Sequence, residues 1–202
     1  MDAEASRSLL SKPPSEVALC LLGGLLTHQS ADGAVSVRLT EVESYGGKSD
    51  PASHAYRGRT PRNESMFAPA GTLYVYRSHG IHWCCNVVTG SSDDPSAVLL
   101  RAGQVVDGLD VARTRRGARV SDRHLARGPG CLGQALGLTE TDDGTDLLTS
   151  GGVTLLVPEH PVAAKDVRRG PRVGVSKASE LEWRFWLADE PTVSAYRKSP
   201  RA

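Results

Sequence analysis

The chain has 202 residues, of which 39% are hydrophobic and 23% charged, a composition typical of one globular domain with a hydrophobic core. No apolar run reaches the roughly 18 residues that a membrane helix needs, which argues against a membrane-spanning protein. The net charge is only +1, so the overall charge balance does not by itself indicate a nucleic-acid partner.

The N-terminal region predicts a tail followed by a helix. Residues 1–14 are polar, and we expect a flexible tail there, ahead of a single domain over residues 15–202. No apolar signal-peptide core is present, so we expect a cytoplasmic protein. Residues 16–27 are apolar and predict a buried helix, although Gly23 and Gly24 disfavour its second half.

Residues 34–45 predict a β-strand with an unusual end. Because alternate residues of a strand share a face, one face carries, in order, Val35, Val37, Leu39, Glu41, Glu43 and Tyr45. An apolar face therefore continues into two carboxylates and a phenol. Carboxylates are rarely buried unless they are paired or used in chemistry, so Glu41 and Glu43 are candidates for a special role.

The remaining pattern predicts a mainly antiparallel α+β domain. Strands are expected at 72–77, 81–89, 97–106, 153–157, 171–176 and 184–188, and helices at 108–117, 121–126, 130–137 and 162–167. Most of the strands follow one another with short turns between them. This order favours a curved antiparallel sheet flanked by helices over a parallel βαβ arrangement.

Two segments between these strands carry polar and aromatic side chains. Residues 46–71 form a long loop with His54 and three arginines, which is a candidate wall of an active site. Residues 71–90 predict a β-hairpin whose tip includes Gly80, a residue that tolerates positive φ. Its aromatic residues either cover the core with their polar ends in water or present flat rings that stack on a base.

The sequence pattern alone does not assign a role to the arginines or to the cysteines. Seven arginines lie between Arg101 and Arg127 against three aspartates, which gives either a phosphate-binding face or a solvated basic surface. The four cysteines show no CxxC spacing and, with the six histidines, form no zinc signature. We therefore expect free thiols and no metal.

In order and spacing the chain resembles the alkyladenine (3-methyladenine) DNA glycosylase family, as a bacterial member. The matching segments are LLGGLL (21–26), TEVESYGG (40–47), DPASHAYRGRTPRN (50–63), MF (66–67), GTLYVYRSHGIHWCCN (71–86), VLLRA (98–102), RGPGCLGQALGL (127–138) and PRVGVSKASE (171–180). They extend from about residue 15 to residue 196. The resemblance implies an enzyme that flips a damaged purine out of duplex DNA and hydrolyses its N-glycosidic bond.

The resemblance also assigns the catalytic roles. Glu43 matches the general base that activates a water molecule, and Arg101 and the main-chain carbonyl of Val173 match groups that hold this water. For Glu41 we favour a structural role as an acceptor of ion pairs. No lysine lies in the strand, hairpin or pocket segments, so Schiff-base lyase chemistry is not expected and the enzyme should be monofunctional.

The base pocket and the DNA contact follow from the same resemblance. Tyr45 matches one stacking wall, and Tyr76 and His54 match the opposite wall. Asn86 matches a floor residue that disfavours purines with a 2-amino group. His79, at the tip of the protruding hairpin, matches the side chain that wedges into the duplex, where many relatives have Tyr.

The partners expected from this resemblance are simple. The substrate is double-stranded DNA containing damaged purines, with no cofactor, no metal and no membrane, and the protein acts as a monomer in the cytoplasm at the nucleoid. Two other interpretations stay open: a catalytically silent nucleic-acid-binding module, and a hydrolase of free nucleosides. An assay that compares free nucleoside with lesion-containing duplex separates all three.

Overall fold

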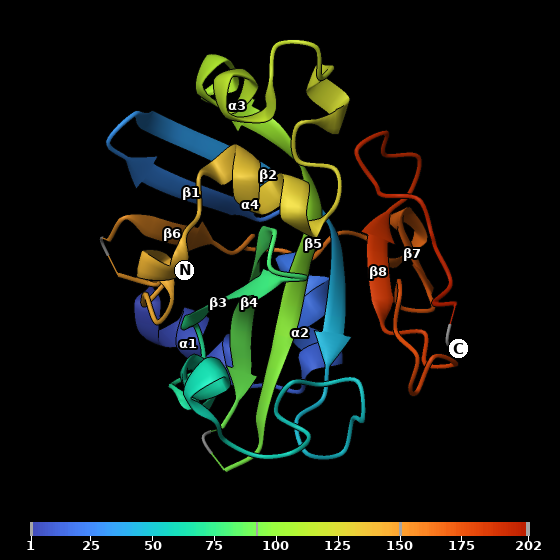
Figure 1. The fold of residues 1–202 in the computed structure, drawn as a ribbon. Helices are drawn as coiled ribbons and strands as arrows, with labels where there is room; N and C mark the ends of the chain where they lie inside the picture. Colours follow the sequence, from blue (N-terminus) through green and yellow to red (C-terminus); the bar gives the residue numbers. More distant parts are fainter. Residues whose placement is uncertain (1, 92, 150, 201–202) are drawn as a thin grey trace.

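A curved antiparallel sheet forms the centre of the molecule (Figure 1). The computed structural model describes residues 2–91, 93–149 and 151–200. Within them the strand order is β3-β4-β5-β2-β1-β6, and β8 pairs with both β2 and β7. The strands are β1 (Leu25–Ser30), β2 (Gly33–Tyr45), β3 (Leu73–Ser78), β4 (His82–Gly90), β5 (Pro95–Asp107), β6 (Val153–Leu156), β7 (Val167–Gly170) and β8 (Arg184–Leu187). The expected α+β class with an antiparallel sheet is confirmed.

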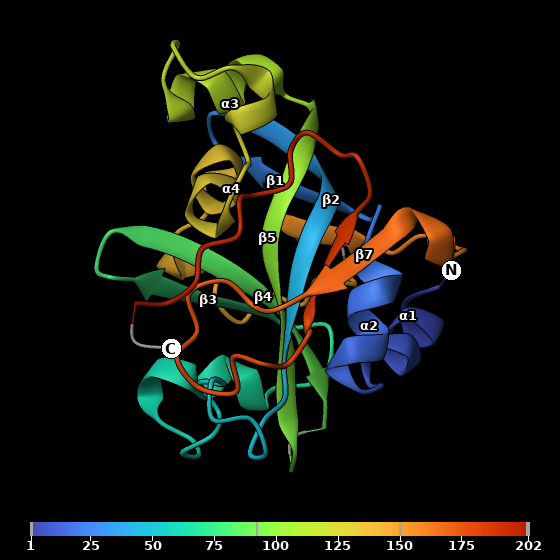
Figure 2. The ribbon, with the colours of Figure 1, turned by 90° about the vertical axis from the view of Figure 1, so that its right-hand side faces the viewer.

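Helices cover the sheet from two sides. They are α1 (Ala3–Leu10), α2 (Pro14–Leu21), α3 (Leu109–Arg116) and α4 (Pro129–Leu136), with short 3₁₀ helices η1 (Pro61–Phe67), η2 (Asp122–His124), η3 (Glu140–Asp142) and η4 (Ala164–Asp166). Figure 2 shows α1 and α2 on one side of β2 and β5, and α4 with the β3–β4 hairpin on the other. Apolar residues of α2, α4, β2 and β5 form one continuous core.

The N-terminal segment differs from expectation. Residues 3–10, predicted as part of a flexible tail, form α1, and Leu10 is fully buried. Arg7 anchors this helix by donating to the carbonyl of Ala70 and to the Asp146 carboxylate. The helix predicted over 16–27 is wrong in its second half, because Gly23 takes a φ of 81° and the chain turns into β1.

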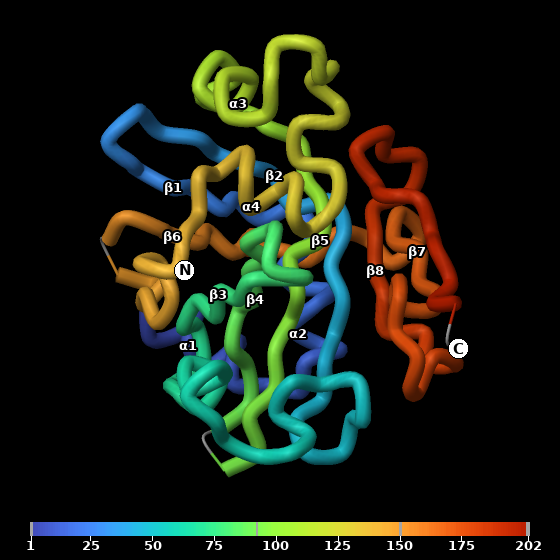
Figure 3. Tube along the Cα trace, in the orientation of Figure 1, coloured from blue at the N-terminus to red at the C-terminus, as the bar shows by residue number. Residues whose placement is uncertain are grey.

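Three further elements differ from the predicted ones in place or in length. The strand predicted at 171–176 is wrong, because the strand in this region is β7 and the residues after it form a loop. The helices predicted at 121–126 and 162–167 shorten to η2 and η4. Figure 3 follows the chain after β8 as a red tube that lies beside β7 and β8.

Two β-bulges explain the unusual end of β2. Between Leu39 and Glu41 the strand advances two residues while β5 advances one, so Thr40 is an extra residue in β2. The next step of the register skips Arg101 in β5. Each bulge exchanges the faces of its strand. The core side therefore passes from Leu39 to Val42, and the two carboxylates do not continue the core face as the simple alternation predicts.

Candidate active site

A pocket of about 610 Å³ opens between the sheet, the 46–71 loop and the segment after β7. Its lining includes most of the predicted site residues: Tyr45, His54, Tyr76, His79, Asn86, Arg101 and Val173. Glu43 does not line it, because its side chain is fully buried directly behind the wall. The structure thus gathers residues that are up to 128 positions apart in the sequence, from Tyr45 to Val173, around one cavity.

The Glu43 carboxylate is held by groups that themselves line the pocket. The Val173 N–H donates to its Oε1 at 2.7 Å, and the Tyr45 hydroxyl donates to its Oε2 at 2.9 Å. Arg101 Nη1 lies 3.4 Å from Oε1. Arg101 shares a face of β5 with the pocket-lining Leu99 by ordinary strand alternation, and it is the residue that the register with β2 skips.

Electrostatics make this carboxyl unusual. Burial raises the pKa of Glu43, while the Arg101 charge, the Val173 N–H and the Tyr45 hydroxyl oppose the rise. Burial and the neighbouring Glu43 raise the pKa of Tyr45 well above its usual range, so the phenol stays protonated and remains a donor. A carboxyl whose pKa is raised toward neutrality is suited to accept a proton from a reacting water.

Glu41 lies beside this group as the centre of an ion-pair network. Its Oε1 accepts from Arg101 Nε at 3.0 Å and from Arg184 Nε at 2.6 Å, and its Oε2 accepts from the Ser194 N–H at 2.7 Å. These contacts connect β2, β5, β8 and the C-terminal segment, and they agree with a structural role for Glu41. Arg184 and Ser194 were not found from the sequence, because no motif relates them to a strand more than 140 positions earlier.

Aromatic rings from the 46–71 loop and from β3 form one wall of the pocket. The His54 and Tyr76 rings meet edge to face with centroids 4.6 Å apart, and Tyr74 stacks on Tyr76 at 5.6 Å. His54 Nδ1 lies 2.9 Å from the Tyr74 hydroxyl, whose pKa burial raises to about 12. Burial lowers the pKa of His54, with a further contribution from the Arg62 charge. This wall is therefore uncharged at neutral pH.

Asn86 and the hairpin tip complete the cavity. The buried Asn86 side chain donates to the Tyr74 carbonyl at 3.1 Å, which fixes its orientation. At the tip, His79 takes a φ of 51° and Gly80 a φ of 69°, and His79 Nδ1 lies 3.0 Å from the Ser78 hydroxyl. The tip residue Ile81 is 69% exposed. The wedge role of His79 stays a prediction.

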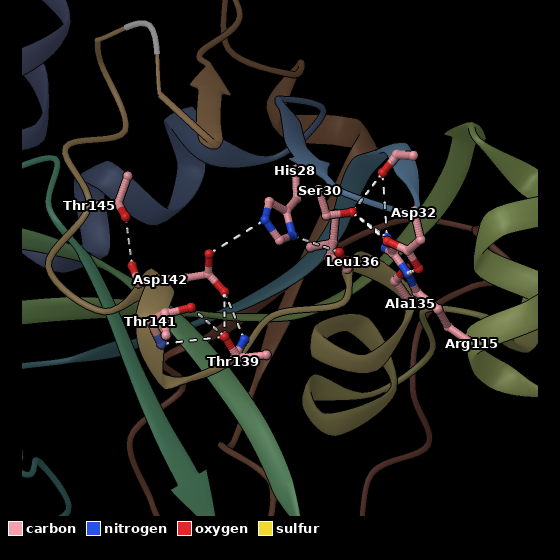
Figure 4. A network of polar contacts seen from close by, with 11 residues as sticks. His28, Ser30, Asp32, Arg115, Ala135, Leu136, Thr139, Thr141, Asp142 and Thr145 are labelled. Carbon is pink, nitrogen blue, oxygen red and sulfur yellow. Dashed lines mark hydrogen bonds and ion pairs between the residues drawn. The ribbon is translucent and has the colours of Figure 1, made fainter.

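The arginines of α3 are engaged within the protein. Arg115 binds Asp32 and Ser30 in the β1–β2 turn and the Ala135 carbonyl of α4, next to a contact between His28 and Asp142 (Figure 4). Arg113 pairs with Asp110 and Asp122, and Arg116 donates to Gln134 and to the Leu125 carbonyl. The expectation of a free basic face is not met at these three arginines, whereas the exposed Arg62 and Lys177 line the pocket. The expectation that the pocket segments contain no lysine is therefore wrong at Lys177.

The described residues offer neither a metal-binding cluster nor a membrane-spanning helix. Residues 2–91, 93–149 and 151–200 contain no cluster of three His, Cys, Asp or Glu side chains that could hold a metal ion. Across the same ranges, none of the helices has the length and hydropathy needed to cross a membrane.

Comparison with known proteins agrees with the motif pattern. A family model described as methylpurine-DNA glycosylase matches residues 8–191. A protein of Nocardia farcinica named "Putative 3-methyladenine DNA glycosylase" is 52% identical over 199 residues, covering 96% of this chain and 92% of its own. Proteins of the same name from Streptomyces avermitilis and Frankia casuarinae are 47% and 49% identical, covering 95% and 94% of this chain and 91% and 92% of their own.

Proposed function

The chain belongs to the methylpurine-DNA glycosylase family, whose members are hydrolases of N-glycosyl bonds in DNA, and on this premise we propose that it excises damaged purines from duplex DNA. In this proposal a purine is flipped into the pocket, water cleaves its N-glycosidic bond, and an abasic site remains. The observation that carries the proposal is the buried Glu43 carboxylate, whose partners Tyr45, Val173 and Arg101 all line the pocket.

Glu43 has the acceptor capacity that the reaction needs. A carboxylate offers about four lone-pair positions. Among the described residues, the Val173 N–H and the Tyr45 hydroxyl engage one position on each oxygen, and Arg101 Nη1 pairs with Oε1 at 3.4 Å. The remaining position on Oε2 can accept a water proton. As the water oxygen bonds to the anomeric carbon, Glu43 takes that proton, and the electron pair of the broken C–N bond leaves with the base.

The other residues bind and select the base. Tyr45 on one side and Tyr76 with His54 on the other supply rings that stack on a flat heterocycle. Arg101 and the Val173 carbonyl are proposed to hold the water. Asn86 excludes a purine 2-amino group in two ways: its side chain contacts that group sterically, and it leaves the N–H donor of the 2-amino group without an acceptor. His79 fills the gap left in the duplex, and the protein acts as a monomer without a cofactor.

The proposal is tested with single-lesion duplexes. Wild type and Glu43→Gln are incubated with duplexes containing 3-methyladenine, 7-methylguanine, hypoxanthine or ethenoadenine, with undamaged duplex and the free nucleosides as controls. We expect release of a damaged base from duplex only, with Glu43→Gln slower by about a hundredfold to ten-thousandfold and its lesion-DNA binding retained. Excision by folded Glu43→Gln at the wild-type rate removes Glu43 as the base. An inactive wild type that still binds DNA points to the silent binding module.

A further inference from the structure

A fully buried ion pair lies directly behind the pocket wall. Arg172 and Asp50 are 0% exposed in their side chains, and Arg172 is the largest of the fully buried side chains in the described residues. The pair is bidentate: Arg172 Nη1 donates to Asp50 Oδ2 at 2.5 Å and Nη2 donates to Oδ1 at 3.0 Å. Both residues lie in the motif segments 50–63 and 171–180, but neither was assigned a role from the sequence, and neither lines the pocket.

The guanidinium also contacts two aromatic rings. Its central carbon lies 4.7 Å from the ring centroid of Tyr45 and 5.3 Å from that of Trp183. Both distances fall within the range of cation–π contacts. Since Tyr45 is one wall of the pocket, Arg172 supports the ring against which a base would stack.

The pair joins three segments around Glu43. Arg172 donates to the Ser44 carbonyl in β2, and Asp50 accepts the Gly46 and Ala52 N–H groups of the loop after β2. The residue after Arg172 is Val173, whose N–H donates to Glu43. The backbone on either side of the catalytic carboxylate is therefore held by one guanidinium.

The cost of this arrangement argues for a role beyond filling space. Burying two charges gives little net stability relative to an apolar pair of similar volume. Arg172 Nε has no hydrogen-bond partner among the described residues, which adds to that cost. What an apolar pair could not supply is a planar fork that fixes a carboxylate, a carbonyl and two rings in one geometry.

We propose that the Arg172–Asp50 pair is a positioning device for the reaction, which keeps the Val173 N–H on Glu43 and the Tyr45 ring against the base. The proposal rests on the function proposed for Glu43. Arg172 touches neither the base nor the water, so it acts through Val173 and Tyr45. Loosening the pair weakens the hydrogen bond that stabilises the Glu43 carboxylate, so Glu43 should then ionise at higher pH.

Besides the Val173 N–H and the Tyr45 hydroxyl, the groups that face Glu43 are Arg101 from β5, Glu41 from β2 and Tyr76 from β3. The variant Arg172→Lys changes none of these three. Arg172→Lys keeps the charge and the aliphatic stem but loses the fork. Arg115→Lys is the matched control, because Arg115 is also nearly buried, with 9% side-chain exposure, and bidentate to Asp32, but lies outside the pocket.

Two measurements on the whole protein test the proposal. The first is the single-turnover excision rate between pH 5 and pH 9. The second is the pH titration of the Val173 amide resonance in the free protein, which follows Glu43 ionisation through their hydrogen bond. We expect Arg172→Lys to move both midpoints to higher pH by about one unit and to lower the plateau rate at least tenfold. Arg115→Lys should leave both midpoints at the wild-type value.

Other outcomes overturn the proposal. Profiles of Arg172→Lys that superimpose on wild type, or an equal shift in Arg115→Lys, leave the pair with a structural role only. If Arg172→Lys does not fold, Asp50→Asn replaces it, because that variant keeps the size of the side chain and removes the carboxylate of the pair; unshifted midpoints in it likewise overturn the proposal. A wild type that excises no lesion refutes the proposed function alone, since the amide titration still decides whether Arg172 controls Glu43.

Discussion

Glu43 illustrates the conflict between stability and chemistry at a single residue. Its carboxyl is buried against Tyr45, Val173 and Arg101, and burial raises its pKa. A raised pKa in the folded state means that folding favours the protonated form. The stabilising effect of that preference is present at low pH and is lost as the pH rises through the folded-state pKa. Where the pH is high enough to ionise it, the Glu43 carboxylate therefore reduces the stability of the fold.

Glu43→Gln should thus be more stable than wild type at pH 8, by about 1 kcal/mol, with the difference shrinking as the pH falls. The amide fits, because its oxygen can accept from Val173 and its NH₂ can donate to the Tyr45 oxygen. Urea unfolding at pH 5 and pH 8 measures the effect. Glu64→Gln is the control, since Glu64 is 59% exposed and pairs with Arg59 on the surface. A Glu43→Gln protein less stable than wild type at pH 8 contradicts this account.

Asn86 should control which purines are accepted. Its side chain is held by the Tyr74 carbonyl and lines the pocket. Asn86→Ser shortens this side chain, so excision of 2-amino purines, normal guanine included, should rise on the order of tenfold relative to hypoxanthine. Single-turnover rates on matched duplexes give the ratio, with the hypoxanthine rate as the internal reference. An unchanged ratio means that guanine is excluded by another part of the pocket.

We expect the β3–β4 hairpin to act on DNA through the side chain at its tip, His79. His79 occupies left-handed backbone, where His is better tolerated than bulky residues, and its imidazole offers a smaller stacking face than a phenol. His79→Ala should lower the flipping equilibrium and the excision rate. His79→Tyr should match or exceed wild-type flipping, with a small loss of stability from the backbone conformation.

Stopped-flow fluorescence with an ethenoadenine duplex measures flipping for both variants. Ile81→Ala is the companion variant, because Ile81 is the most exposed large apolar residue described in the chain. Equal flipping in wild type, His79→Ala and His79→Tyr, with a loss in Ile81→Ala, transfers the wedge role to Ile81.

Strands were easier to predict than their contacts. Alternation of apolar residues located β2 through β6, and the order of strands indicated an antiparallel sheet. The paired bulges at Thr40 and Arg101 were invisible, because a bulge is defined by register against a partner strand and leaves no fixed residue pattern. The site residues came from motif order. Asp50 and Arg172 lie in two of the motif segments, but their pairing was not predicted, because they are 122 positions apart and only the folded chain brings them together.

At the scale of the whole molecule, DNA binding should depend more on where the charged side chains lie than on the net charge. The net charge is +1, and three arginines of α3 are tied up by aspartates and by polar groups of the chain, while Arg62 and Lys177 are exposed at the pocket. Phosphate contacts are expected where the cations are free and close to the flipped nucleotide. The DNA-binding face should therefore surround the pocket.

Salt dependence tests this placement. Arg62→Gln and Lys177→Gln should each reduce the slope of log affinity against log salt concentration by about one, and weaken binding to all duplexes alike. Arg113→Gln should leave the slope unchanged, because Asp110 and Asp122 already neutralise its charge. Fluorescence anisotropy with undamaged duplex at several salt concentrations gives the slopes. A flatter slope in Arg113→Gln alone places the duplex over α3.

The bulge at Thr40 has a consequence for how β2 tolerates change. Before it, Val35, Val37 and Leu39 face the core; after it, Val42 faces the core, while Glu41, Glu43 and Tyr45 face the catalytic side. In a saturation scan of β2, substitutions at odd-numbered positions up to residue 39 should lower the cellular abundance of the protein. From residue 42 onward, substitutions at even-numbered positions should lower its abundance. Substitutions of Glu43 and Tyr45 should instead lower repair activity while the protein still accumulates. The period-two pattern of such a scan should reverse its phase at Thr40.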